Sequence, residues 1–171
     1  AQLQFRKSHL KFSRLNHIFI SHLHGDHCFG LLGLISTLNL LGRTAELHIH
    51  SPKGLETLLT PMLDFFNRQM TYKVLFHEFD TKEPMLIYED RSLTVTTIPL
   101  RHRMPCCGFL FAEKRCPNHI IREMVDFYQV PVYELNRIKN GADYVTSEGK
   151  TVSNNLLTRP SAPSRSYAYS S

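Results

Sequence analysis

Residues 16–27 read NHIFISHLHGDH, and they decide the fold of this 171-residue chain. The first half, 16–21, is a short run of β-branched and aromatic residues, which is typical of a buried strand. Leucine and isoleucine then recur at helical spacing over Phe29–Leu41, and Gly42 stands where a helix C-cap is expected. The stretch therefore predicts a strand, a polar loop and a helix in direct succession.

The loop between that strand and that helix carries four potential metal ligands within six residues. They are His22, His24, Asp26 and His27, at the spacing H-x-H-x-D-H. Imidazole nitrogens and carboxylate oxygens bind zinc, and Gly25 permits the tight backbone that brings the four side chains together. The loop can divide them, with the first two histidines facing one ion and Asp26 and His27 facing a second. A chance polar turn is the alternative, and this spacing in this context argues against it.

Strand-like and helical segments alternate along the rest of the chain, which indicates the α/β class. Ser51 as an N-cap and Pro52 at the first helical position predict a second helix. The pattern loosens over 130–163, which suggests a projecting arm, and a strand begins near Arg165. The other expected elements are strands at 45–50, 73–79, 92–100 and 107–113 and an amphipathic helix around 120–128.

Composition limits the classes of protein to which the chain can belong. The net charge of +5 and the pI of about 9.1 favour polyanionic partners such as nucleic acid, although many basic surfaces bind nothing. No run reaches the roughly 20 apolar residues of a membrane span, and the basic N-terminus lacks the apolar core of a secretory signal. The four cysteines form no disulfide framework, so we expect reduced thiols and a cytoplasmic protein.

Three segments together resemble a known family. H-x-H-x-D-H after a buried strand resembles the signature of the metallo-β-lactamase fold, an αββα sandwich. More closely, residues 18–34, IFISHLHGDHCFGLLGL, resemble the zinc motif of RNase Z, the family of tRNA 3′-processing endonucleases. Residues 99–111, PLRHRMPCCGFLF, resemble that family's second histidine segment, and 167–171, YAYSS, resemble the strand before its zinc-bridging Asp. The resemblance runs from about Phe5 to Ser171.

The resemblance implies a set of site residues. His22, His24, Asp26 and His27 match the family's metal motif position by position, and His102 matches the third histidine of its first zinc site. These are five of the family's seven ligands for two Zn2+ ions per complete active site. Asp26 is also expected to be catalytic, as the base that orients or deprotonates the attacking water.

The resemblance also implies a reaction. RNase Z enzymes hydrolyse the phosphodiester just after the discriminator base of precursor tRNA, by attack of a metal-activated hydroxide. The products are a tRNA with a 3′-hydroxyl and a trailer with a 5′-phosphate. We therefore expect a zinc-dependent endoribonuclease that removes the 3′ trailer from precursor tRNA.

The family's organisation suggests three parts for this chain. Residues 1–115 are expected to form the metallo-β-lactamase-like core, 116–163 a substrate-binding arm, and 164–171 a return strand of the core. The sandwich is expected to be incomplete at both ends, because the bridging Asp and the last His ligand would follow Ser171. Part of the core sheet would likewise precede Ala1.

Expectations for the partners of this chain come from the family as well. Within the arm, Pro131, Arg137 and Lys139 are expected to contact tRNA, although Val130 stands where the family has glycine. RNase Z enzymes are homodimers that pair through the region that matches Phe29–Leu41, so a homodimer through that region is expected here.

Two other functional hypotheses stay open. One is a different hydrolase on the same fold, such as a small-molecule phosphodiesterase or thioesterase. The other is a non-catalytic metal- or RNA-binding protein. The remaining chemistry-bearing residues are interpreted as packed or surface residues; they are Cys28, His9, His17, His48, His50, His77 and His119.

Overall fold

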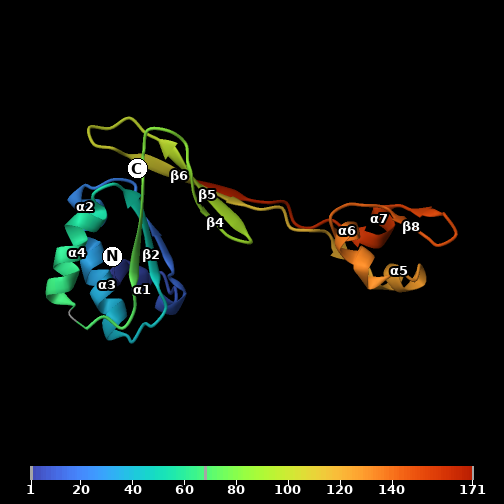
Figure 1. Cartoon of the computed structure of the whole chain (residues 1–171), viewed down its shortest axis with the longest axis horizontal. Helices are drawn as coiled ribbons and strands as arrows, with labels where there is room; N and C mark the ends of the chain where they lie inside the picture. The colour runs from blue at the N-terminus through green and yellow to red at the C-terminus, as the bar shows by residue number, and fades with distance from the viewer. Residues whose placement is uncertain (1, 68, 171) are drawn as a thin grey trace. The chain divides into compact units, whose positions relative to one another are not determined.

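The computed structural model describes residues 2–67 and 69–170 and divides the chain into two compact units. The first unit takes the described parts of residues 1–89, 94–111 and 167–171, and the second takes residues 90–93 and 112–166. Figure 1 shows both units and labels many of their helices and strands. The mixture of helices and sheets confirms the α/β class expected from the sequence.

The first unit contains most of the longer elements. Its helices are α1 (Gln2–Lys7), η1 (Phe12–Arg14), α2 (Gly25–Cys28), α3 (Gly30–Leu40) and α4 (Leu55–Phe66). Its strands are β1 (His17–Phe19), β2 (Leu47–Pro52), β3 (Val74–Phe79), β4 (Leu86–Glu89), β5 (Leu93–Pro99), β6 (Cys107–Glu113) and β11 (Ser166–Tyr169). Strands β5, β6 and β11 each extend by one or two residues into the second unit.

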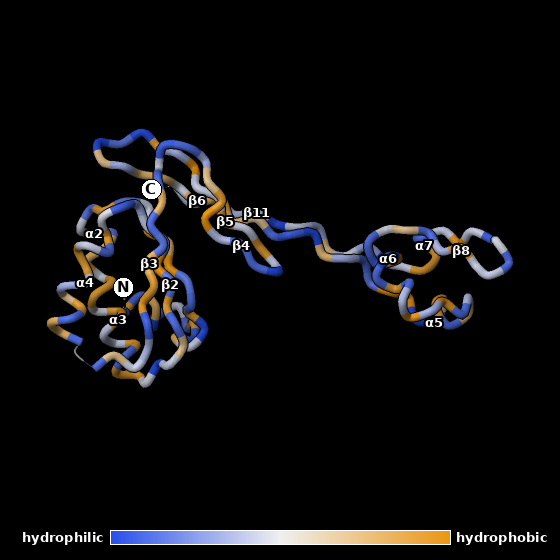
Figure 2. The backbone as a smooth tube through the Cα atoms, viewed as in Figure 1, coloured by the Kyte–Doolittle hydropathy of each residue, from blue (hydrophilic) through white to orange (hydrophobic). Residues whose placement is uncertain are grey.

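A parallel sheet in the order β1-β2-β3 forms the base of the first unit. Residues of β2 that alternate toward one face, Leu47 and Ile49, are fully buried against α3 and α4. Figure 2 shows hydrophobic residues along these strands and helices. Because a one-residue slip would turn the apolar side chains of β2 to the opposite face, this burial fixes the register of the strand.

The second sheet has the order β11-β6-β5-β4. Strand β4 pairs antiparallel with β5 and was not expected from the sequence, because its four residues are too short to show a clear alternation. A Cβ at Gly108 in β6 would collide with the backbone carbonyl of Tyr169 in β11, so the close approach of these two strands requires glycine there.

The helix start predicted at Ser51 and Pro52 is wrong. Both residues belong to β2, where they pair with Glu78 and Phe79 of β3. Helix α4 begins at Leu55 instead, after Gly54, whose φ of 107° lies in the left-handed region that favours glycine. The Glu78 Oε1 atom accepts hydrogen bonds from the backbone N–H of Gly54 at 2.8 Å and of Glu56 at 3.1 Å. A side chain from a neighbouring strand thus caps this helix.

Replacing Glu78 with alanine is expected to lower the free energy of unfolding of the first unit by about 1 kcal/mol, the usual cost of losing an N-cap acceptor. Urea denaturation followed by far-UV circular dichroism measures this change. The matched variant Glu78→Gln keeps an Oε1 acceptor and should lose less. Equal losses in the two variants would show that the hydrogen bonds to the helix do not stabilise the fold.

The second unit is built from short elements around a small core of its own. The core residues come from all parts of the segment and are Val125, Val130, Ile138, Val152 and Leu157. The elements are β7 (His119–Ile120), α5 (Arg122–Phe127), η2 (Val132–Glu134), α6 (Leu135–Lys139), β8 (Tyr144–Val145), β9 (Thr151–Val152), α7 (Asn154–Leu157) and β10 (Thr158–Arg159). The loosened sequence pattern therefore corresponds to a packed unit of very short elements.

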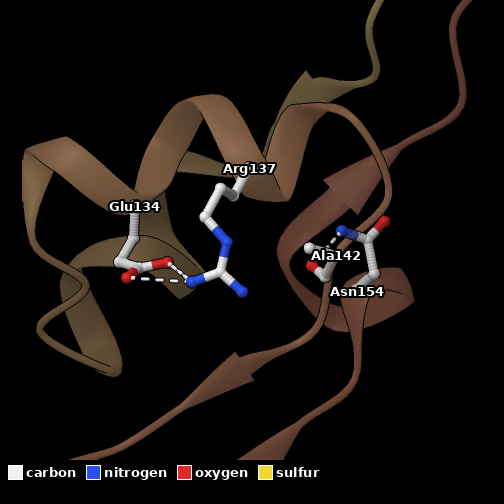
Figure 3. Close-up of polar contacts among 4 residues, drawn as sticks. All are labelled: Glu134, Arg137, Ala142 and Asn154. Carbon is white, nitrogen blue, oxygen red and sulfur yellow. Dashed lines mark hydrogen bonds and ion pairs between the residues drawn. The ribbon is translucent and has the colours of Figure 1, made fainter.

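One asparagine ties several turns of the second unit together. The Asn154 Nδ2 atom donates to the carbonyl oxygen of Ile138 at 2.6 Å. It also donates to the carbonyl oxygen of Ala142 at 2.8 Å (Figure 3). Its Oδ1 atom accepts a hydrogen bond from the Thr158 hydroxyl at 2.8 Å, and its backbone N–H donates to Asp143 at 2.7 Å. These bonds connect the first residue of α7 to α6, to the turn that follows α6 and to β10.

The sequence analysis expects no membrane span, and the helices of the structure can be compared with that expectation. None of the helices in the described part of the chain has the length and apolar character that a membrane span needs.

Candidate metal centre

The histidine-rich loop leaves the parallel sheet at the end of β1. The backbone N–H of Ile20 still donates to the carbonyl of His50 in β2 at 2.8 Å, so the loop starts from a fixed position. His24 is the N-cap residue of α2, with extended backbone angles, and Asp26 and His27 lie inside that single helical turn. The change from strand to helix across the five residues 20–24 therefore gathers the side chains of the motif.

Three histidines lie within reach of one ion. Each of His22, His24 and His102 offers one ring nitrogen, and these three nitrogens all lie within 4.8 Å of one another. The Nε2 atom of His22 is 3.1 Å from the Nδ1 atom of His24. The ring of His102 has its centroid 5.3 Å from that of His22 and 5.0 Å from that of His24. Among the described residues, this is the one such group of three.

Backbone hydrogen bonds bring the second segment to the loop. The N–H of Cys107, the first residue of β6, donates to the carbonyl of Ser21 at 3.1 Å. The N–H of Leu100 donates to the carbonyl of Cys106 at 3.2 Å, which closes the loop that carries His102. Two segments about eighty residues apart in sequence are thereby fixed beside each other.

Hydrogen bonds also orient the rings. The Ser21 hydroxyl lies 3.0 Å from His22 Nδ1, which leaves Nε2 to face His24. Such outer contacts hold a histidine ligand in position. The Nδ1 atom of His102 accepts a hydrogen bond from the backbone N–H of Arg103 at 2.7 Å. In that state the neutral ring carries its proton on Nε2, so binding an ion through Nε2 requires the ring to give up this contact.

Asp26 and His27 stand next to each other rather than inside the group of three. The Oδ2 atom of Asp26 is 3.5 Å from Nε2 of His27, and the Asp26 side chain is 79% exposed. The His27 ring centroid is 4.0 Å from that of His22. The structure thus brings together four of the five sequence-predicted metal ligands, His22, His24, His27 and His102, and Asp26 lies beside His27.

Burial and charge favour the metal-binding form of His22. Its side chain is buried, and this burial, followed by the neighbouring imidazoles of His27, His24 and His102, lowers its pKa. An uncharged ring offers a lone pair to a metal ion. Cys28 is also buried next to the loop, and its burial raises the pKa of the thiol, which disfavours the thiolate that would bind zinc.

A pocket of about 540 Å³ opens beside His102. Four basic side chains that the sequence analysis did not single out line it: Lys53, Lys82, Arg101 and Arg103. The arginines flank His102 in the sequence R-H-R, which was the one available signal. A pocket with this charge next to a group of imidazoles suits a substrate that carries phosphate.

The fold and the metal loop define a class of protein, and comparison with known families agrees. Residues 1–118 match the model of the Beta-lactamase superfamily domain. The chain therefore belongs to the beta-lactamase superfamily. Its fold class, predicted from the motif, is confirmed.

Individual relatives narrow the relationship to RNase Z. The chain is 77% identical over 171 residues to Ribonuclease Z of Bacteroides fragilis, and these residues are 100% of this chain and 56% of the relative. For Ribonuclease Z of Bacteroides thetaiotaomicron the identity is also 77%, over 100% of this chain and 54% of the relative. The resemblance to the RNase Z family is confirmed, and the chain spans about half the length of the relatives it matches.

A solved structure shares the fold. The crystal structure of human tRNase Z, short form, is similar with a TM-score of 0.59 and 31% sequence identity. The match covers 66% of this chain and 50% of that chain.

The predicted tRNA contacts lie in the second unit. Pro131 precedes η2, and Arg137 and Lys139 lie exposed on α6. Both carboxylate oxygens of Glu134 accept hydrogen bonds from Arg137 Nη1, at 3.2 and 3.0 Å (Figure 3). Val130 is buried in the small core, which gives a physical reason for a residue larger than glycine at this position.

Proposed function

We propose that the protein that carries this chain is a zinc-dependent endoribonuclease that removes the 3′ trailer from precursor tRNA. The observation that carries the proposal is the group of His22, His24 and His102 beside a basic pocket, in a chain closely related to Ribonuclease Z. The donor set supports a borderline metal ion, because three imidazole nitrogens are typical ligands of catalytic zinc.

The side chains of the loop have distinct roles in this proposal. His22, His24 and His102 would hold one ion, and Asp26 and His27 would contribute to a second. When bound, such ions lower the pKa of water and stabilise charge on phosphoryl oxygens. The Asp26 carboxylate, exposed at the surface of the loop, orients the attacking water and accepts its proton.

The pocket beside His102 would hold the RNA backbone. Lys53, Lys82, Arg101 and Arg103 are charged hydrogen-bond donors, and phosphate oxygens are their natural acceptors. Positive charge at this place keeps the scissile phosphodiester near the loop without reading base sequence.

Removal of the metal tests the proposal. The protein treated with a chelator should not cleave a precursor tRNA with a 3′ trailer, and added Zn2+ should restore cleavage. If the zinc-loaded protein leaves precursor tRNA intact but hydrolyses a small phosphodiester or thioester, it is a different hydrolase of the same fold.

The expected segment 116–163, which lies within the second unit, is proposed as the substrate-binding arm, and residues 164–171 as a return strand of the core. Arg137 and Lys139 are exposed cations on one short helix, and Pro131 shapes the turn before it. The contact between Arg137 and Glu134 partly neutralises this surface, so Lys139 contributes an important share of its positive charge.

Replacing Arg137 and Lys139 together with alanine is expected to weaken binding of precursor tRNA. The slope of log K against log salt concentration should become shallower by the amount that about two phosphate contacts contribute. Titrations at several salt concentrations give the slope. The control is Lys7→Ala, an exposed cation on α1 of the first unit. An unchanged slope in the double variant would remove the arm from the tRNA interface.

We also propose the homodimer through the region Phe29–Leu41 and a cytoplasmic location. Helix α3 buries one face, while Phe29, Leu40 and Leu41 are 74%, 86% and 63% exposed. Leu40 lines a hollow shared with Phe66, which is 65% exposed. A second copy of this chain would cover these apolar side chains.

The variant Leu40→Glu is expected to convert the dimer to a monomer, because a buried carboxylate without a partner is costly at an apolar contact. Light scattering coupled to size exclusion measures the molar mass. Leu10→Glu, at another exposed leucine, should leave the mass unchanged. A native protein that already runs as a monomer would contradict this proposal.

A further inference from the structure

Four histidines from three adjacent strands lie together in the first unit, and we call them the histidine ladder. His17 comes from β1, His48 and His50 from β2, and His77 from β3. The register pairs His17 with His48 and His50 with His77. The two-residue spacing within β2 places both of its histidines on the same face of the sheet.

The four rings of the ladder form a closed circuit of neighbours. The ring centroids are 4.7 Å apart for His17 and His48, and 5.2 Å apart for His48 and His77. They are 4.8 Å apart for His77 and His50, and 5.5 Å apart for His50 and His17. Each imidazole therefore lies beside two others of the set.

Two nitrogen pairs within the ladder are close enough to share an ion. His17 Nδ1 is 3.2 Å from His50 Nε2, and His48 Nδ1 is 2.9 Å from His77 Nε2. Two imidazoles on one tetrahedral zinc have their nitrogens about 3.3 Å apart, given zinc–nitrogen bonds of about 2.0–2.1 Å. The pair in the histidine loop of the candidate metal centre has a similar separation, 3.1 Å.

One nitrogen of the ladder lacks a hydrogen-bond partner among the residues that the structure describes. His50 is 3% exposed, and its Nδ1 atom is buried without a hydrogen bond. Buried polar atoms are normally paired, and leaving one unpaired is costly. This Nδ1 atom is not the Nε2 atom that faces His17, so an ion bound through Nδ1 would pair it, whereas an ion bound through Nε2 would leave it unpaired.

The surroundings of the ladder lower the pKa of two of its rings, His50 and His77. Burial, followed by the imidazoles of His77, His17 and His48, lowers the pKa of His50 to about 4. Burial and then His48 also lower the pKa of His77. At neutral pH both rings are therefore in the deprotonated form that binds metals.

Aromatic side chains border the ladder. The Phe19 ring stacks on His50 with centroids 4.5 Å apart, and the Tyr88 ring lies 4.3 Å from that of His17. These rings cover parts of His17 and His50, whereas His77 stays exposed.

We propose that the histidine ladder is a second transition-metal site, which binds one divalent ion of the zinc, copper or nickel class through imidazole nitrogens. This ligand set excludes magnesium and calcium, which prefer oxygen. Coordination by more than two of the imidazoles needs rotation of the rings, because the ladder presents two close pairs rather than three mutually close nitrogens, and its neighbouring rings are largely stacked. The ion would join β1, β2 and β3, independently of the proposed cleavage reaction.

The test uses Zn2+ alone on a background without the first site. In the protein that carries this chain, with His24, Asp26, His27 and His102 all replaced by alanine, one equivalent of Zn2+ should remain bound at the ladder after dialysis, as measured by elemental analysis. The bound ion should raise the melting temperature, because it binds the folded state. Adding His50→Gln or His77→Gln to this background should weaken Zn2+ binding at least about tenfold.

Controls separate a site from a chance contact. His119→Gln, at an exposed histidine of the second unit, should leave the Zn2+ content of the background unchanged. If His50→Gln fails to fold by circular dichroism, the exposed His77 decides the question. A background that retains no Zn2+, or one that retains it after His77→Gln, overturns the proposal and leaves a set of histidines that only hydrogen-bond to one another.

Discussion

Replacing Asp26 with alanine is expected to lower the rate of precursor-tRNA cleavage by about 1,000-fold, in the range that a positioned general base contributes. Asp26 is the one carboxylate of the loop motif, and its Oδ2 atom lies 3.5 Å from His27 Nε2. Its exposure leaves it accessible to a substrate at the surface. Single-turnover cleavage by the protein that carries this chain, with saturating Zn2+, measures the effect on the chemical step.

The control for this prediction is Asp64→Asn, an exposed carboxylate on α4 outside the loop. It should cleave at the native rate. A native rate in Asp26→Ala would show that the carboxylate has no part in the reaction, and a loss of equal size in both variants would indicate damage to the fold.

Replacing His24 and His102 together with alanine is expected to weaken Zn2+ binding at the histidine loop by at least about 1,000-fold. A zinc ion with a complete set of protein ligands gains about 10–16 kcal/mol, so each imidazole contributes several kcal/mol. Neither side chain belongs to the hydrophobic core, so the fold should survive. Calorimetric titration with Zn2+ separates this site from any other by its affinity.

His119→Gln is again the matched control, because it removes an imidazole that is exposed and lies in the second unit. Its titration should match that of the native chain. If the double variant still takes up the tightly bound ion, then His22, His24 and His102 do not form the principal metal centre.

The position of the metal loop could be predicted because its ligands are contiguous. His22, His24, Asp26 and His27 occupy six residues between a strand and a helix, so local structure alone gathers them. His102 is different, since only hydrogen bonds such as that from Cys107 to Ser21 bring its segment to the loop. The family resemblance supplied this residue, and no local pattern did.

The histidine ladder could not be predicted because its members are about thirty residues apart along the chain. His17, His48 and His77 come together only through the register of a parallel sheet, which sequence spacing does not encode. The error at Ser51 and Pro52 has a similar origin. Their signature for a helix start is local, but pairing with β3 extends the strand through both residues.

The elements and the core of the second unit could not be predicted from hydrophobic patterns in the sequence. Its helices and strands are too short for hydrophobic periodicity to develop, and its core takes single residues from separate turns. Val130 is an example. The sequence analysis considers this position only for a tRNA contact, but the side chain packs in the core of the second unit.

Mapping the ends of the cleavage products tests the central claim most directly. The zinc-loaded protein that carries this chain should cut a precursor tRNA once, just after the discriminator base. The tRNA should end in a 3′-hydroxyl and the trailer should begin with a 5′-phosphate. Cuts scattered along the RNA, or no cut by a protein with its metal sites filled, would contradict the assignment as a tRNA 3′-processing endonuclease.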